Sequence, residues 1–89
     1  MTADERIRAI HALLTEKLSP IFLQIEDNSE EHAGHKSAGG AGHFTIHIAA
    51  PEFFGKSLIQ QHRMVYGAVD PLMDGEIHAL SIQIEKVTD

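Results

Sequence analysis

The sequence predicts a small α+β domain in which two helices cover one face of a three-stranded mixed sheet. Two segments carry apolar residues at steps of three and four, the spacing of a helix that buries one face. Three other segments alternate apolar and polar residues, as half-buried strands do. A chain of 89 residues is long enough for one small core, so we expect residues 1–89 to form a single domain.

The first helix is expected to begin after Thr2. Thr2 and Glu5 have the spacing of a capping box, in which each side chain accepts a hydrogen bond from the other residue's backbone N–H. The apolar face that follows consists of Ile7, Ile10, Leu14 and Leu18. The helix should end at Ser19, because the residue before a proline avoids helical backbone angles.

Two strands are expected next, over residues 21–27 and 43–50. The inward residues of the first are Ile21, Leu23 and Ile25. In the second, the inward residues Phe44, Ile46 and Ile48 alternate with outward His43, Thr45 and His47. The connection, residues 28–42, holds four glycines and shows no periodicity. A connection this long in a small domain is usually functional or disordered, and the sequence leaves both alternatives open.

The second helix is expected to follow a turn at Gly55, with the Ser57 hydroxyl as its N-cap. One stripe of this helix consists of Leu58, His62, Val65, Val69 and Leu72. The stripe places an imidazole among apolar residues, so we interpret His62 as a core histidine held by a hydrogen bond rather than as a ligand.

The pair Asp70–Pro71 is expected to interrupt that helix. Aspartate suits an N-cap and proline the first helical position, so a short turn through Met73 should follow and end at Gly75. The last strand should run from Ile77 or Ala79 to Glu85. Its inward residues are Leu80, Ile82 and Ile84.

The expected order is helix, strand, strand, helix, short helical turn, strand. The first two strands should pair antiparallel, whereas a right-handed crossover through the helix makes the last pair parallel. The residues expected in the core are Leu14, Leu23, Ile46, Ile48, Leu58, Val65, Leu80 and Ile82.

Charge and composition exclude several classes of function. Seven basic against thirteen acidic residues give a net charge of −6, which argues against a strong non-specific nucleic-acid binder. The absence of cysteine excludes thiolate ligands and cysteine nucleophiles from this chain. The chain has no apolar run of the ~20 residues that a bilayer span needs and no signal-peptide core at its start. We therefore expect a cytoplasmic protein without membrane contact.

No enzyme motif is complete. The run Gly55-Lys56-Ser57 resembles the end of a phosphate-binding loop, but Ala50 stands where that motif requires glycine. No nucleophile elbow is present either, so we expect a protein without catalytic residues. Histidines are the stronger candidates: His32 and His35 lie on the glycine-rich connection, and His78 lies at the start of the last strand. Imidazole binds several transition metals, so this pattern alone names none.

Several separated motifs resemble the BolA family. They are residues 54–57 (FGKS), 60–66 (QQHRMVY) and 77–81 (IHALS), preceded by 27–29 (DNS), 32–35 (HAGH) and 43–44 (HF). The similarity extends from about Leu14 to Ile84, with one departure: the family usually has arginine where this chain has Gln61. The resemblance implies a fold similar to the type II KH domain.

The resemblance also implies a partner and a cofactor. BolA proteins pair with monothiol glutaredoxins, and the pair holds a bridging [2Fe–2S] cluster for which glutaredoxin and glutathione supply thiolates. Carried over by motif, the ligands of this chain are His78 and His32, with His35 as the alternative to His32. Histidine ligation would raise the reduction potential relative to all-cysteine ligation, and acid should loosen the cluster. No cofactor is expected in the isolated chain, which should be a monomer or a weak homodimer.

A second function stays open because some BolA proteins regulate transcription and KH-like folds bind nucleic acids. Lys56, Arg63 and the helix start at Gly55 and Ser57 are the candidate phosphate contacts. The glycine-x-x-glycine loop of KH domains is absent, so any DNA binding should be weak.

Overall fold

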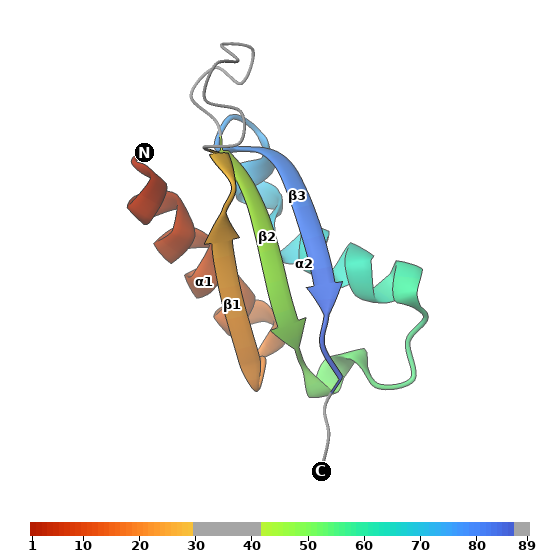
Figure 1. The fold of residues 1–89 in the computed structure, drawn as a ribbon. Coiled ribbons are helices and arrows are strands. Elements are labelled where there is room, and N and C mark those ends of the chain that lie inside the picture. The colour runs from red at the N-terminus through yellow and green to blue at the C-terminus, as the bar shows by residue number, and fades with distance from the viewer. Residues whose placement is uncertain (30–41, 87–89) are drawn as a thin grey trace.

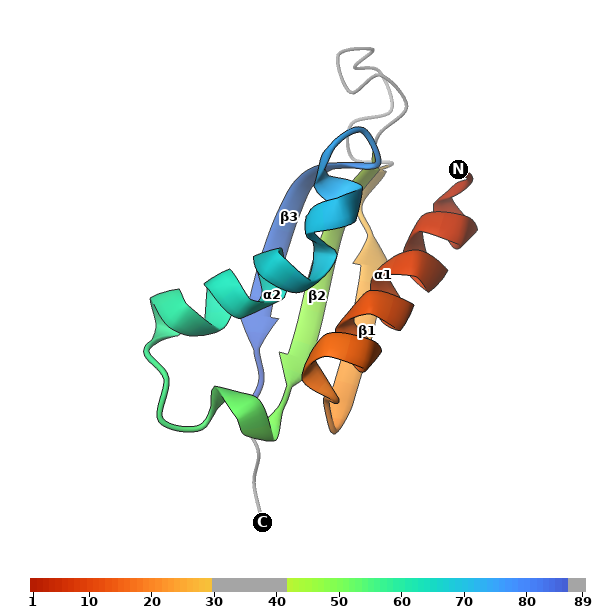
Figure 2. The ribbon, with the colours of Figure 1, turned by 180° about the vertical axis from the view of Figure 1, so that it is seen from behind.

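The computed structural model describes residues 1–29 and 42–86 (Figure 1). In order, its elements are α1 (Ala3–Leu18), β1 (Phe22–Asp27), β2 (Gly42–Ala49), the 3-10 helix η3 (Pro51–Phe53), α2 (Leu58–Met73) and β3 (Ile77–Ile84). The strands form one sheet in the order β1-β2-β3, with β1 antiparallel and β3 parallel to the central β2. Both helices cover the same face of the sheet (Figure 2). The predicted fold class and strand directions are confirmed.

The first helix forms as its sequence indicates. The Thr2 hydroxyl accepts from the Glu5 N–H at 3.1 Å, and the Glu5 carboxylate accepts from the Thr2 N–H at 2.7 Å. At the other end Ser19 takes a left-handed conformation, with φ of 45°, and donates its N–H to the Thr15 carbonyl. The buried face of α1 consists of Ile10, Leu14 and Leu18.

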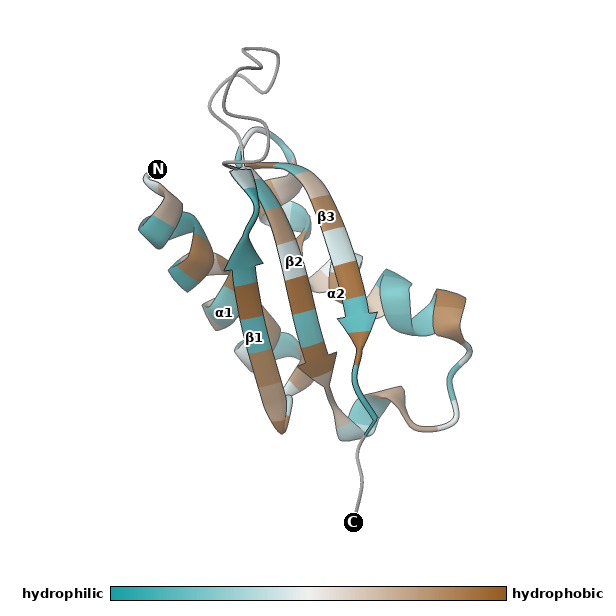
Figure 3. Ribbon diagram, viewed as in Figure 1, coloured by the Kyte–Doolittle hydropathy of each residue, from teal (hydrophilic) through white to brown (hydrophobic). Residues whose placement is uncertain are grey.

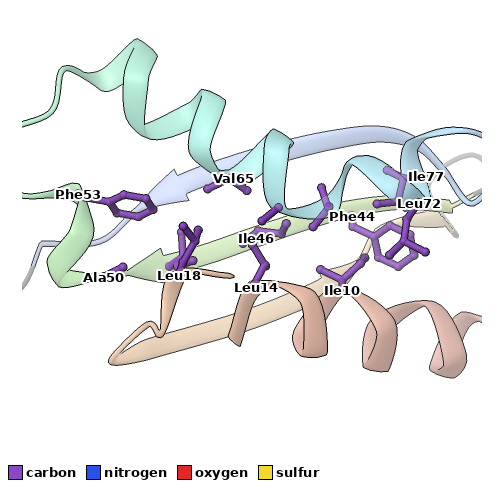
Figure 4. Packing of buried hydrophobic residues seen from close by; sticks show 13 residues of the cluster. Ile10, Leu14, Leu18, Phe44, Ile46, Ala50, Phe53, Val65, Leu72 and Ile77 are labelled. Atoms are coloured by element: carbon purple, nitrogen blue, oxygen red, sulfur yellow. The ribbon is translucent and has the colours of Figure 1, made fainter. Parts of the chain in front are cut away.

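The central strand β2 supplies the middle of the core. Phe44, Ile46 and Ile48 are each 2% exposed or less and belong to the core cluster. Figure 4 shows side chains of both helices around Phe44 and Ile46. Hydrophobic and hydrophilic residues alternate along β1 and β2 (Figure 3), so the opposite face of the sheet carries polar side chains.

The prediction that Leu58 lies in the core is wrong, and other predicted core residues are less buried than expected. Leu58 is 62% exposed because the N-terminal turns of α2 extend past the outer edge of β3 (Figures 1 and 2). Leu23, Leu80 and Ile82 pack against the core but are only half-buried, since β1 and β3 are edge strands. Ile21 is also exposed, and β1 begins one residue after it.

The predicted break at Asp70–Pro71 is wrong as well. The helix α2 continues through Pro71 to Met73. Pro71 lies in the last turn, where its missing N–H removes a single bond to the carbonyl four residues before it. Burial of Val69 and Leu72 on both sides of this position offsets that loss. Gly75, with φ of 105°, follows the helix end as predicted.

None of the helices in residues 1–29 and 42–86 has the length and apolar character needed to cross a membrane.

Candidate functional site

The predicted ligand His78 occupies an irregularity at the start of β3. Gly42 pairs with Ile77, whereas the next residue, His43, pairs with Ala79, so His78 is the extra residue of a β-bulge. A bulge bends the strand and redirects the side chain of the extra residue. Here it allows both Ile77 and Leu80 to pack against the core while His78 is exposed.

The two residues before His78 hold its backbone in place. Ile77 is 3% exposed, and the Gly42 N–H donates to the Glu76 carbonyl at 3.1 Å, which joins the first residue of β2 to the residue before β3. Gly42 is required for this close packing, because a Cβ there would overlap the ring of Phe44. His78 is therefore presented from a fixed position.

A second imidazole lies beside it. The ring centroids of His43 and His78 are 5.0 Å apart, and their planes are tilted by 43°. The backbone of His43 is fixed too: its N–H donates to the Ser29 hydroxyl at 3.1 Å, and its carbonyl accepts from the Asn28 N–H at 2.7 Å. From sequence we interpreted His43 as an ordinary solvent-facing strand residue. The signal that could have found it was the predicted parallel pairing, which places the first residues of the two strands side by side.

The other predicted ligands, His32 and His35, lie in residues 30–41, outside the described residues. The described chain stops at Ser29 and resumes at Gly42, and both of these residues are bonded at the His43–His78 end of the sheet. The segment that carries His32 and His35 therefore starts and ends at this site.

The donor chemistry suits a transition metal or an iron–sulfur cluster, since imidazole nitrogen is a common ligand of both. Within residues 1–29 and 42–86, no three histidine or carboxylate side chains converge to hold a metal ion. Any site at His78 must therefore take further ligands from residues 30–41 or from another molecule.

The predicted role of His62 as a hydrogen-bonded core residue is not confirmed. Its side chain is only half-buried on α2, and no hydrogen bond joins it to a described residue. Like Leu58, it lies in the part of α2 that reaches the edge of the sheet.

The turn before α2, which carries Gly55, Lys56 and Ser57, lies at the opposite end of the sheet from the start of β3 (Figure 1), and Arg63 follows in the second turn of α2. Gly55 has φ of 79°, and the Ser57 hydroxyl accepts from the Gln60 N–H at 3.2 Å, which confirms the predicted turn and N-cap. Lys56 and Arg63 are exposed, and neither forms an ion pair with a described residue.

Gln61, the departure from the family pattern, has a structural role in the same loop. Its side-chain amide donates to the carbonyls of Phe53 and Lys56, both at 3.1 Å. The neutral amide thus holds the turn before α2 in place.

The open face of the sheet carries a cluster that the sequence did not reveal. His47 on β2 contacts Glu26 on β1 through Nε2 at 2.7 Å and Glu85 after β3 through Nδ1 at 3.2 Å. These hydrogen bonds, first with Glu26 and then with Glu85, raise the pKa of His47 above its ordinary value of 6.5. The signal was the strand register, which places both glutamates diagonally across from His47.

We predict that His47 titrates above pH 6.5 in the folded protein. Because the pKa of His47 is raised in the folded protein, its contribution to the free energy of unfolding is fully present at pH values below the pKa of His47 in the unfolded chain. This contribution is lost as the pH rises through the pKa of His47 in the folded protein. NMR titration of the imidazole would measure this, with Glu26→Gln expected to lower the midpoint and Glu16→Gln, on exposed α1 surface, to leave it unchanged. A wild-type midpoint at or below 6.5 would contradict the assignment.

Comparison with known proteins gives concordant matches. A family model described as BolA-like protein matches residues 14–88. SufE-like protein 1, chloroplastic/mitochondrial, of Arabidopsis thaliana is 40% identical over 79 residues, covering 82% of this chain and 21% of that protein. BolA-like protein 1 of Mus musculus is 39% identical over 75 residues, covering 84% of this chain and 53% of that protein. The chain thus spans about a fifth and about half of these relatives.

Solved structures agree with the sequence matches. The BolA domain of SufE1 from Arabidopsis thaliana superimposes with a TM-score of 0.79 at 35% identity, covering 97% of this chain and 95% of that one. The solution structure of BolA1 protein from Mus musculus gives a TM-score of 0.77 at 35% identity, covering 97% and 68%. Because the plant relative is named chloroplastic/mitochondrial, the cytoplasmic location expected from the sequence stays a prediction.

Proposed function

The chain belongs to the BolA-like family, and from that premise we propose that it pairs with a monothiol glutaredoxin to hold a bridging [2Fe–2S] cluster. The role would be non-catalytic, in the trafficking of clusters or in iron or redox sensing. The observation that carries this proposal is the β-bulge that presents His78 at the end of the sheet where the segment containing His32 and His35 starts and ends.

Two ligands would come from this chain and two from outside it. His78 is one, and His32 is the other, with His35 as its alternative. The sulfur ligands would come from glutaredoxin and glutathione, because this chain has no cysteine. When bound, the cluster supplies one-electron chemistry and transferable iron and sulfide.

The rest of the site acts by positioning. Buried Ile77 and the Gly42–Glu76 hydrogen bond fix the backbone of His78, and the ring of His43 lies against its imidazole. A ligand held in place before binding loses less conformational entropy than one that must first be ordered. The residues that make these contacts should therefore favour binding of the cluster at His78 without being ligands themselves.

The proposal is tested by co-expressing the chain with a monothiol glutaredoxin and recording the absorption and circular dichroism of the purified mixture. We expect a heterocomplex whose visible circular dichroism differs from that of glutaredoxin alone. A glutaredoxin spectrum that the chain leaves unchanged, with no heterocomplex on size exclusion, would refute it.

Replacing His43 should separate positioning from ligation. We expect His43→Ala to keep the heterocomplex but to change its circular dichroism and to speed loss of the cluster to a chelator, because the neighbouring ring would no longer restrain His78. The matched control is His11→Ala, an exposed histidine on α1. Complete loss of the cluster in His43→Ala would make His43 a ligand instead.

A second candidate function, weak DNA binding, is favoured by one observation. Lys56 and Arg63 are exposed near the N-terminus of α2, and no described acidic residue neutralises them. The net charge of −6 opposes a strong electrostatic interaction. We therefore rank this function below the cluster.

Salt dependence distinguishes this candidate. Replacing Lys56 or Arg63 with alanine should flatten the slope of log affinity against log salt by about one unit per lost phosphate contact. Fluorescence anisotropy with labelled duplex DNA over a salt series would measure the slope, with Lys17→Ala as the control. Tight, sequence-specific binding at physiological salt that neither substitution changes would contradict this account.

A further inference from the structure

The N-terminal half of α2 extends beyond the sheet and carries uncovered apolar side chains. In both views it lies past the outer edge of β3 (Figures 1 and 2). Leu58 is 62% exposed and Ile59 65%, while Phe54 in the preceding turn is 93% exposed. The apolar stripe of α2 thus continues past the point where the sheet beneath it ends.

A hollow of about 800 Å³ lies beside these residues. Its walls include Phe53 from η3, Phe54 from the turn that follows, Leu58 and Gln61 from α2, and Ile84 at the end of β3. Most of this lining is apolar.

The adjoining edge of β3 offers free backbone groups. The Glu85 N–H donates to the Ile48 carbonyl at 2.8 Å, and in a parallel pair alternate residues face the neighbouring strand. The N–H and C=O groups of Ile82 and Ile84 therefore point away from β2. Among the described residues no strand pairs with this edge, and the Tyr66 hydroxyl donates to the outward Leu80 carbonyl at 3.2 Å. Eight residues of β3 give an edge about 26 Å long.

The charges around the hollow differ from those of the chain as a whole. Lys86 lines the hollow, and Lys56 lies in the turn two residues after the lining residue Phe54; neither forms an ion pair with a described residue. Glu85 also lines the hollow, but its carboxylate is bonded to His47. Two unpaired lysines at this hollow on a chain of net charge −6 favour an acidic partner.

We propose that this surface binds an extended, acidic segment of a partner protein, which adds to the edge of β3 as a fourth strand. Its backbone would pair with Ile82 and Ile84, an apolar side chain would enter the hollow against Leu58, and flanking carboxylates would meet the cations. A second copy of this chain fits less well, because pairing β3 with β3 would bring the same cations together. This surface lies at the opposite end of the sheet from His78, so the proposal does not depend on the cluster.

The test uses a displayed library of cysteine-free peptides of about ten residues, enough to cover the edge of β3. The library is first depleted on the Leu58→Glu variant and then selected on the wild-type protein. Enriched peptides are expected to alternate apolar residues with Asp or Glu. A synthetic peptide of this kind should slow amide hydrogen exchange at Ile82 and Ile84 at least tenfold. Exchange at Ser81 and Gln83, which face β2, should not change.

Matched variants complete the test. Leu58→Glu should weaken peptide binding at least tenfold, whereas Phe22→Glu, at an exposed apolar residue of the opposite edge strand, should not. Methylation of alternate peptide nitrogens that face β3 should also weaken binding at least tenfold. The proposal is overturned if no peptide is enriched or if the bound peptide is helical. It is also overturned if a single-stranded oligonucleotide occupies the hollow more tightly than the peptide, or if the free protein dimerises through Ile82 and Ile84.

Discussion

Replacing His78 with alanine is expected to abolish the visible spectrum of a cluster shared with glutaredoxin. Its backbone is fixed by buried Ile77 and by the bond between Gly42 and Glu76, so the imidazole is already placed at the site. The measurement is the visible circular dichroism of the purified mixture of glutaredoxin and the variant.

The loop histidines should behave differently. We expect His32→Ala to weaken the cluster and His35→Ala alone to do little. The double substitution should destabilise the cluster by much more than the sum of the two single substitutions, because each histidine could otherwise replace the other as ligand. His62→Ala is the internal control, since His62 lies on α2. If His78→Ala kept the cluster while His62→Ala destroyed it without unfolding the protein, the ligand assignment would be wrong.

Replacing Ile46 with alanine is expected to cost about 2–5 kcal/mol of the free energy of unfolding. Ile46 is 0% exposed on the central strand, and residues of both helices surround it, so truncation leaves a cavity that cannot easily close. Urea denaturation would measure the loss, which should appear in the midpoint with little change in slope.

Leu80→Ala is the matched comparison. From the sequence we expected Leu80 in the core, where the same range would apply if its strand were central and buried. Because β3 is an edge strand and Leu80 is half-buried, its substitution should cost less than that of Ile46. A larger loss for Leu80 than for Ile46 would contradict the described core.

Local patterns were sufficient to predict most of the fold. The alternation in residues 43–50 predicted β2 because burial on one face of a strand follows directly from the two-residue repeat. The same reasoning failed for Leu58, since an apolar stripe shows which side of a helix is buried but not how far the sheet extends beneath it. The break at Asp70–Pro71 was wrong because tertiary burial of Leu72 outweighs a local preference.

The candidate site was predicted less completely. His78 was identified by its motif, but its place in a β-bulge and its contact with His43 depend on the pairing of β2 with β3. The bridging of Glu26 and Glu85 by His47 likewise depends on the register of three strands. These contacts join residues far apart in the chain, so no local pattern contains them.

Histidine ligation by this chain is tested most directly by pulsed electron paramagnetic resonance on the reduced cluster of the heterocomplex. Labelling only this chain with ¹⁵N-histidine identifies its nitrogens without disturbing the thiolates. We predict coupling to two labelled histidine nitrogens in the wild-type complex, with the coupling from His78 absent in any cluster that forms with His78→Ala. A cluster that shows no coupling to a labelled nitrogen of this chain would contradict the proposed function.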